Sequence, residues 1–371
     1  MKVDWLIIGA GFAGVTLAER IATQLGQKVL VVEKRDHVGG NAYDEYDEHG
    51  VLVHRYGPHI FHTNLKHVWD YLSYFTRWRP YYHRVLAVVD GKKVPVPFNL
   101  NSLYALFPPG QAARLEAALI DEYGFRARVP ILRLRESEKR DLRFLADYIY
   151  EKIFYGYTLK QWGLKPEELD PSVTGRVPVY VSRDDRYFRD RYQAMPVPGY
   201  NQLFRLMLAH PNIKVLLNTD YREIENEVKF SRMVYTGPID AFFDYVHGKL
   251  PYRSLRFEFA ILEREWFQEV GTVNYPNEFD FTRITEFKHL TGQVLPQTAV
   301  VYEYPTDEGD PCYPVLSDET RELYYRYESE ARKLKGVYFV GRLAEYRYYN
   351  MDEAVARALE VFEEIIRGTE E

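Results

Sequence analysis

The sequence predicts an α/β fold in which a parallel-sheet domain is interrupted along the chain by a helical insert domain and an antiparallel β-sheet domain. Residues 1–35 show a strand, turn, helix and strand in order, and apolar residues then take helical spacing from about 100 to 170. Short β-branched and aromatic runs alternate with turn residues from about 227 to 305. The first pattern returns at 336–341 and 352–367, a buried strand and a helix that begins with acidic residues. The parallel-sheet domain is therefore expected to be discontinuous.

The individual elements follow from the same patterns, taken in chain order. We expect a strand at 3–8, a tight turn at 9–14, a helix at 15–25, a buried strand at 29–32, helices at 111–122 and 142–154, and strands of the antiparallel sheet at 227–235 and 297–304. The predicted parallel-sheet domain comprises 1–75, 196–240 and 330–371, the helical insert 99–178, and the antiparallel sheet domain 76–98, 179–195 and 241–329.

The composition excludes several classes of protein. The chain has 371 residues, enough for two or three domains and for a core without disulfide staples. Its one cysteine, Cys312, can form neither an internal disulfide nor a cysteine zinc site, so we expect a cytoplasmic protein. A net charge of −6 with well-mixed charges argues against nucleic-acid binding, and no apolar run is long enough to span a membrane.

A glycine-rich turn follows the first strand. Gly9, Gly11 and Gly14 have the spacing GxGxxG between a strand and a helix, which permits a tight turn and a close approach of the backbone to a diphosphate. Glu33 ends the next strand, where a carboxylate can accept hydrogen bonds from a ribose 2′-OH. Together they predict a Rossmann-like dinucleotide site.

Two further segments indicate which dinucleotide binds. Residues 35–41 contain a second glycine pair and resemble the extension of glutathione-reductase-type flavoproteins that passes close to FAD. Residues 337–342, followed by Met351 and Asp352 at a helix start, resemble the closing FAD segment of the same group, where the helix dipole can face the flavin. We therefore expect FAD as the cofactor.

Four motifs then carry a more specific resemblance. They read GPHIFHT at 57–63, GYTLKQWG at 156–163, FTRITE at 281–286, and GRL through YRY at 341–348. In collinear order over nearly the whole chain they resemble bacterial UDP-galactopyranose mutases, which are FAD-dependent flavoproteins. The resemblance implies an isomerase that interconverts UDP-galactopyranose and UDP-galactofuranose. Reduced FAD would be the active form, its N5 attacking the anomeric carbon with no net redox change.

The resemblance also assigns roles to individual residues. The residues that would hold FAD are Gly9, Gly11, Phe12, Ala13, Gly14, Glu33, Lys34, Gly39, Gly40, Asn41, His59, Ile60, Arg342, Met351 and Asp352. Three residues would be catalytic: Arg176 and Arg283, which neutralise the diphosphate, and His62, which lies near the reactive face of the flavin. The remaining substrate-binding residues would be Phe154, Tyr157, Thr158, Trp162, Tyr187, Phe188, Asn274, Tyr313, Tyr348 and His83.

The polar stretch 163–175 is bounded by glycines and ends just before Arg176, so we expect a lid that closes on substrate. His59 and His62 stand three apart, but no third ligand of suitable spacing is evident and we expect no metal. Several bacterial family members have Asn at the position of His83 and Asp at that of Asn350. His83 can still donate a hydrogen bond to the flavin region or the sugar, whereas Asn350 removes a charge near the phosphates.

The expected partners are the UDP-sugar, a reductant such as NADPH or a flavin reductase, and further copies of the chain in a dimer or larger homo-oligomer. An amine oxidase or desaturase with the same FAD domain is the alternative enzyme. It would couple substrate loss to oxygen or dye reduction and would have a largely apolar tunnel. A non-enzymatic nucleotide-sugar sensor would bind UDP whatever the flavin redox state.

Overall fold

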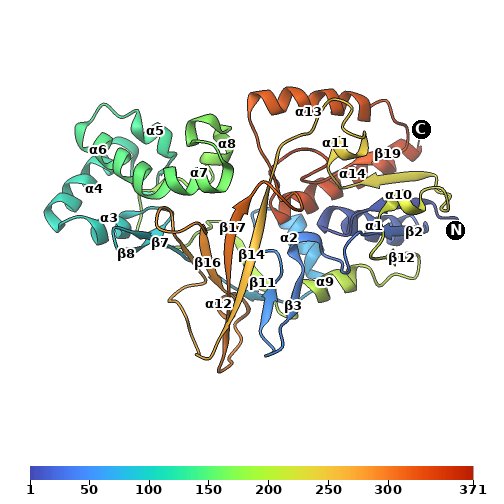
Figure 1. Cartoon of the computed structure of the whole chain (residues 1–371), viewed down its shortest axis with the longest axis horizontal. Coiled ribbons are helices and arrows are strands. Elements are labelled where there is room, and N and C mark those ends of the chain that lie inside the picture. Colours follow the sequence, from blue (N-terminus) through green and yellow to red (C-terminus); the bar gives the residue numbers. More distant parts are fainter. Residues whose placement is uncertain (371) are drawn as a thin grey trace.

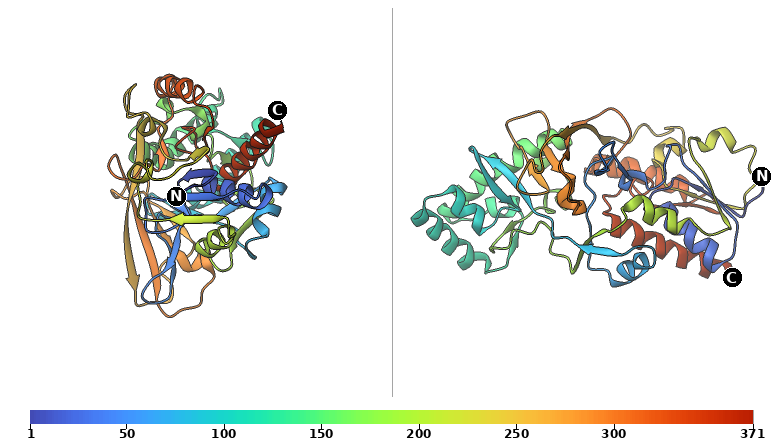
Figure 2. Two further views of the ribbon diagram at one scale, coloured as in Figure 1. Left: turned by 90° about the vertical axis from the view of Figure 1, so that its right-hand side faces the viewer. Right: turned by 90° about the horizontal axis from the view of Figure 1, so that it is seen from below.

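The computed structural model of the chain describes residues 1–370, except the side chains of Ser172, Thr369 and Glu370. Figure 1 shows an elongated molecule with a helical insert at one end and a parallel-sheet domain at the other. The N- and C-termini both lie at the parallel-sheet end, as Figure 1 and the right-hand view of Figure 2 show.

The parallel-sheet domain is built on a five-stranded sheet. Its strands lie in the order β12 (Ile213–Leu216), β2 (Val29–Val32), β1 (Trp5–Ile8), β13 (Arg232–Tyr235) and β19 (Val337–Phe339), and every pair is parallel. Helices α1 (Phe12–Gln24) and α14 (Met351–Glu370) pack on this sheet through buried side chains such as Leu17, Ile21 and Phe362. The predicted mixed α/β class, with a discontinuous Rossmann-like domain, is confirmed.

Two predicted strands differ from expectation. Residues 227–235 were expected in the antiparallel sheet, but β13 pairs in parallel with β1 and β19. A β-branched run does not reveal its partners, and a strand covered on both faces has the same composition in either kind of sheet. The strand expected to be buried at 336–341 forms the edge of the sheet and is half-buried.

The helical insert follows the second β-hairpin of the chain. It contains α3 (Leu100–Leu106), α4 (Pro109–Tyr123), α5 (Ile131–Arg135), α6 (Arg140–Ile149), a π-helix η2 (Tyr150–Tyr155), α7 (Gly156–Trp162), η3 (Pro166–Glu168) and α8 (Pro171–Thr174). Asn99 caps α3 by accepting hydrogen bonds from the N–H groups of Asn101 and Ser102. The short strand β9 (Arg128–Val129) lies between α4 and α5 and pairs with β10 (Val179–Tyr180), which follows α8.

A seven-stranded sheet lies between the two ends of the molecule (Figure 1). Its order is β18 (Tyr313–Pro314), β14 (Tyr252–Leu262), β17 (Thr298–Thr306), β16 (Arg283–Glu286), β15 (Thr272–Asn274), β7 (Val85–Val89) and β8 (Lys92–Val96). All pairs are antiparallel except the parallel pair of β15 and β7, so the sheet is mixed rather than purely antiparallel.

Smaller elements join these units. They are η1 (Gly40–Ala42), the pair β3 (Asp44–Tyr46) and β4 (Leu52–His54), the three-stranded sheet of β5 (Phe61–Thr63), β11 (Tyr192–Pro196) and β6 (Trp78–Pro80), and the helices α2 (Lys66–Ser73), α9 (Tyr200–Met207), α10 (Tyr221–Ile224), α11 (Ile239–Phe242), α12 (Phe287–Thr291) and α13 (Asp318–Ala331). The domain boundaries stay a prediction. Among residues 1–370, no helix combines the length and apolar character needed to cross a membrane.

Candidate functional site

The glycine-rich turn brings backbone close to backbone at the start of α1. A Cβ on Gly14 would lie 2.0 Å from the Gly9 carbonyl oxygen, and one on Gly40 would lie 3.0 Å from the Gly11 Cα, so neither position has room for a side chain. Gly11 precedes α1 and supplies no side-chain cap, which leaves the first N–H groups of the helix to face an anion.

A cavity of about 660 Å³ opens at this turn. Twelve of the predicted cofactor residues line it, namely Gly9, Gly11, Phe12, Ala13, Glu33, Lys34, Gly39, Gly40, Asn41, His59, Arg342 and Met351. Gly14 instead packs behind the turn, Ile60 is buried in the hydrophobic core, and Asp352 lies at the start of α14 close to His62 and Thr63.

Glu33 lines this cavity and accepts two backbone hydrogen bonds. Its Oε2 accepts a hydrogen bond from the Ala10 N–H at 2.9 Å, and its Oε1 accepts one from the Arg35 N–H at 3.0 Å. A carboxylate has further lone pairs, so a ribose hydroxyl can still donate to it. Sequence reasoning did not find Asp310, which forms ion pairs with Lys34 at 2.7 Å and with Arg35 at 2.9 Å beside the same cavity.

Helix α7 carries part of a second group of predicted residues, and two basic side chains fix its position. The Lys160 ammonium donates to the carbonyl oxygens of Tyr275, Phe279 and Phe281, and Arg253 donates to the carbonyls of Lys160 and Gln161 at the end of the helix. Burial lowers the pKa of Lys160 to about 8. These contacts hold α7 against β14 and the loop between β15 and β16.

A buried ion pair lies beside α7. The Nε of Arg283 on β16 is 3.1 Å from Oε2 of Glu303 on β17, and Glu303 is 1% exposed. The register of the sheet pairs Arg283 with both Glu303 and Asn274. Although burial opposes it, Glu303 and the surrounding phenols raise the pKa of Arg283, while burial raises the pKa of Tyr157 nearby. Asn274 Oδ1 is buried and has no hydrogen-bond partner within the described chain, so it is available to a ligand hydroxyl.

The aromatic part of the site is a stack bridged by guanidinium groups. Tyr313 and Tyr348 are parallel with ring centres 5.3 Å apart, and Trp162 lies 5.9 Å from each. The Arg342 Cζ is 5.1 Å from the centre of the Tyr313 ring and 5.2 Å from that of Tyr348. Arg176 covers Tyr348 at 4.2 Å and donates a hydrogen bond to Asn350 Oδ1. Since Asn350 also lines the cavity at the glycine turn, the two groups of residues adjoin.

A third set of rings lies near Arg283. The His62 ring stacks on Phe188 with centres 3.6 Å apart, and its Nδ1 lies 2.9 Å from Asp190 Oδ2. Tyr187 and His83 are in edge contact at 5.8 Å, and the Tyr81 hydroxyl lies 3.0 Å from His83 Nδ1. Burial, together with Arg283, lowers the pKa of His83 to about 3, so its ring is neutral and can act as a donor or an acceptor.

His59 connects these residues to the glycine cavity. Burial, with Arg342 and Arg283 nearby, lowers the pKa of His59 to about 4. Its Nδ1 lies 2.9 Å from the Gly57 carbonyl, and its N–H donates to His54 Nδ1 at 3.0 Å. Within residues 1–370, no group of three or more His, Cys, Asp or Glu side chains is arranged to hold a metal ion.

The structure thus brings most predicted substrate residues around Arg283. Phe154 is different, because it packs in the hydrophobic core of the helical insert. Thr158 is buried on α7. Glu303, Asp190 and Tyr81 were missed, since isolated acidic or phenolic residues in β-rich segments carry no spacing signal that would mark them as partners of Arg283, His62 and His83.

Comparisons with known proteins agree on one family. A family model described as UDP-galactopyranose mutase matches residues 152–348, and one described as an NAD(P)-binding Rossmann-like domain matches 7–75. The chain is 38% identical to a probable UDP-galactopyranose mutase of Klebsiella pneumoniae, over 97% of this chain and 94% of that protein. It is 35% identical to a dTDP-fucopyranose mutase of Escherichia coli, over 99% of both.

Solved structures show a shared fold. A crystal structure of reduced UDP-galactopyranose mutase superposes with a TM-score of 0.78 at 16% identity, covering 100% of this chain and 95% of that one. A putative protoporphyrinogen oxidase from an Exiguobacterium species superposes with a TM-score of 0.65 at 13% identity, covering 98% of each chain.

Proposed function

The chain belongs to the UDP-galactopyranose mutase family and is an isomerase, and from this premise we propose that it interconverts UDP-galactopyranose and UDP-galactofuranose with the help of reduced FAD. One observation carries the proposal. Arg176, Arg283 and the phenol rings form a cationic and aromatic cluster that adjoins the glycine-lined cavity through Asn350 and His59. A nucleotide diphosphate and a flavin can therefore lie next to each other.

The glycine cavity fits FAD, since the close approach of Gly11 and Gly40 and the uncapped start of α1 suit a diphosphate. The predicted lining residues would hold the cofactor, with Glu33 at the ribose and Met351 at the flavin end. When bound and reduced, FAD supplies the nucleophile for the anomeric carbon, so the protein needs no nucleophile of its own.

The protein groups act on the nucleotide and on the sugar. Arg176 and Arg283 stabilise the negative charge that accumulates on the departing diphosphate. Tyr187, Tyr313 and Tyr348 donate phenol hydrogen bonds to it, and Tyr157 packs against the uracil.

The groups proposed to face the sugar are Asn274, whose amide oxygen is unpartnered, and His83, whose ring is neutral. His62, whose Nδ1 lies 2.9 Å from Asp190 Oδ2, would face the reactive side of the flavin when the cofactor is bound.

Residues 163–175 are proposed to close over the bound substrate. The segment is docked on both sides: Arg135 and Tyr150 of the insert contact Glu167 at 2.8 and 2.7 Å, and Arg321 of α13 pairs with Asp170. Because Arg176 follows directly and reaches Asn350, docking of the segment places a cation over the site. Limited proteolysis should cut this stretch more slowly with UDP than without it, and equal cutting would contradict the lid.

The test of the proposed function is to purify the protein, record its absorption spectrum and incubate it with UDP-galactofuranose with and without dithionite. We expect a flavin spectrum that identifies as FAD after release, and conversion to UDP-galactopyranose only in the reduced sample. Oxygen consumption coupled to loss of substrate would favour an oxidase. A parallel incubation with dTDP-fucopyranose addresses substrate choice, because one relative carries that name. Faster turnover of dTDP-fucopyranose would overturn the assignment of the UDP-sugar.

We also propose that the enzyme works in the cytoplasm as a homo-oligomer, supplied with electrons by NADPH or a flavin reductase. Sedimentation and reduction assays with each donor test the last two points.

A further inference from the structure

A second cavity, also about 660 Å³, lies where the helical insert meets the segment 180–189, and it shares no lining residue with the cavity at the glycine turn. It is lined by Phe125, Arg126, Arg128, Tyr180, Ser182, Arg183, Asp184, Arg186 and Arg189. Five of these nine residues are arginines, and the proposed reaction uses none of them.

One wall of the cavity is fixed by backbone pairing. Arg128 on β9 lies directly opposite Tyr180 on β10, with its Cζ 5.6 Å from the centre of that ring. Arg126 has a φ of +70°, and its N–H donates to the Val181 carbonyl at 2.8 Å. Both arginines are thereby held across from residues 180–182.

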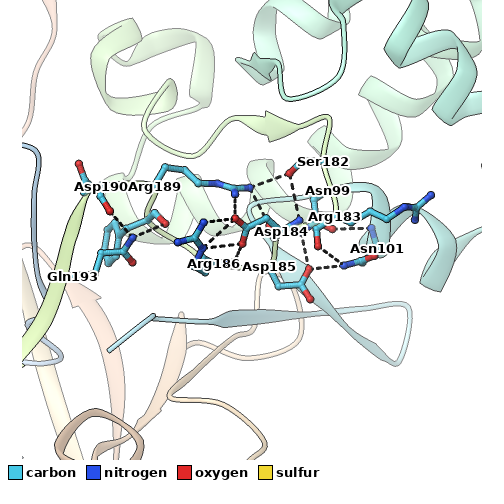
Figure 3. A network of polar contacts seen from close by, with 11 residues as sticks. Asn99, Asn101, Ser182, Arg183, Asp184, Asp185, Arg186, Arg189, Asp190 and Gln193 are labelled. Atoms are coloured by element: carbon cyan, nitrogen blue, oxygen red, sulfur yellow. Dashed lines mark hydrogen bonds and ion pairs between the residues drawn. The ribbon is translucent and has the colours of Figure 1, made fainter. Parts of the chain in front are cut away.

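The opposite wall is organised around one carboxylate. Asp184 accepts a 2.6 Å hydrogen bond from Arg186 Nη2 and pairs with Arg189, which also donates to Ser182 Oγ at 3.0 Å (Figure 3). Asn99 and Asn101 each donate to Asp185 Oδ1 at 2.9 Å and so fix the turn that follows. The guanidinium groups on this wall are therefore held in place.

The charges in the cavity do not balance. Asp184 neutralises part of the charge of Arg186 and Arg189, and Glu116 pairs with Arg183 at 2.8 Å. Asp185 adds a third carboxylate in the same turn, so five guanidinium groups lie near three carboxylates.

Arg126 and Arg128 form no ion pair with any residue between 1 and 370. Asp190 lies close enough for Arg128 to contribute to lowering its pKa, but its carboxylate is engaged by His62 and Asn64. A surplus of about two positive charges in a concave site, beside the rings of Tyr180 and the exposed Phe125, is the setting in which phosphate groups bind.

We propose that this cavity binds a phosphorylated anion with at least two negative charges, and that Arg126 and Arg128 are its main ligands. A diphosphate suits the site, because planar guanidinium groups on both walls can donate paired hydrogen bonds to neighbouring phosphate oxygens. The same loop continues into Tyr187, Phe188 and Asp190, so an occupant would contact the segment that also forms the proposed sugar site.

Equilibrium dialysis of the purified full-length protein with radiolabelled pyrophosphate tests the proposal. We compare wild type, the double variant Arg126→Gln/Arg128→Gln, and Arg283→Ala. The double variant should lose one equivalent of bound pyrophosphate or bind it at least about tenfold more weakly, because each lost charged hydrogen bond contributes roughly that factor. Arg283→Ala should keep that equivalent. If the proposed function is wrong, only the pyrophosphate binding that depends on Arg283 should be absent, and the equivalent bound at this cavity should remain. Failure of the proposed function can therefore be distinguished from failure of the present proposal.

Further arms identify the source of the anion and the cause of any loss. Competition with UDP shows whether the occupant is a nucleotide or free pyrophosphate. Either result supports a diphosphate site. Arg114→Gln serves as a matched control, because Arg114 is an exposed arginine of the same insert that pairs with Asp141 at 2.9 Å, and it should bind as wild type does. Arg126→Lys/Arg128→Lys should recover part of the affinity. Unchanged binding in the Gln double variant, or tighter binding of duplex DNA than of pyrophosphate at this cavity, would overturn the proposal.

Discussion

Replacing Arg283 with lysine tests whether the planar guanidinium, and not only its charge, serves the reaction. The Nε of Arg283 lies 3.1 Å from Glu303 in an ion pair but donates no hydrogen bond to it, and its Nη groups donate none to the described part of the chain. One guanidinium can therefore hold Glu303 and the diphosphate at the same time. A lysine has a single ammonium group, which cannot satisfy both partners in the same geometry.

The size of the effect follows from the lost contact. A hydrogen bond to a charged group contributes about 1.5–3 kcal/mol, and about 1.4 kcal/mol corresponds to a factor of ten. If the ammonium turns toward Glu303, kcat/KM should fall about 10- to 150-fold. Glu303→Gln removes the competing carboxylate, so Arg283→Lys should cost less in that background, with a coupling above about 0.5 kcal/mol.

The assay measures kcat/KM for UDP-galactofuranose with the dithionite-reduced enzyme, alongside the affinity for UDP. Arg256→Lys is the matched control, because Arg256 lies on β14 of the same sheet and forms an exposed ion pair with Glu258. That control should stay within about twofold of wild type. If kcat/KM of Arg283→Lys also stays within about twofold of wild type, or if its loss is the same with and without Glu303, the claim that Arg283 holds both Glu303 and the diphosphate is refuted.

Three further predictions concern the fold around the site. Gly14→Ala should abolish flavin binding and lower the melting temperature, because its Cβ would meet the Gly9 carbonyl at 2.0 Å. The control Gly110→Ala, in the open first turn of α4, should raise the free energy of unfolding by about 0.5–1 kcal/mol. A folded, yellow Gly14→Ala protein would contradict this account. Burial raises the pKa of Asp44 to about 6, so the native state binds this proton more tightly than the unfolded chain, and the contribution of Asp44 to stability should decrease as pH rises from about 4 to 6. Urea unfolding of Asp44→Asn should lack that decrease, and parallel stability profiles of wild type and variant against pH would refute the prediction. Burial lowers the pKa of His54 to about 3, so its contribution to stability is present above about pH 6.5 and is lost as pH falls toward 3; the stability gap between wild type and His54→Gln should shrink between pH 7 and pH 5, and a constant gap would contradict the assignment.

The part of the site that was predictable is the part encoded locally. Gly9, Gly11 and Gly14 have their spacing because strand, turn and helix follow directly in the chain, so the pattern alone predicts β1 and α1. The helix α1 starts at Phe12 rather than at residue 15, so Gly14, the last glycine of the motif, lies within its first turn.

Contacts between distant segments were not predictable from spacing. Glu303 and Asp190 reach Arg283 and His62 only through strand pairing and loop packing, and neither acid has a neighbour in sequence that suggests its partner. The arginines at 126 and 128 and those at 183, 186 and 189 stand in two separate segments of the sequence. Only the pairing of β9 with β10 brings the two segments to one cavity.

The chain order of the five-stranded sheet has a consequence for synthesis in the cell. β1 and α1 leave the ribosome first, but the strand that completes the far edge, β19, and the helix that packs against α1, α14, are translated last. The face of α1 that packs against α14 therefore stays uncovered until α14 has been translated. The helical insert shares one apolar core with the preceding strands β7 and β8, and this stretch is contiguous in sequence, so it can compact while the remainder is still being made.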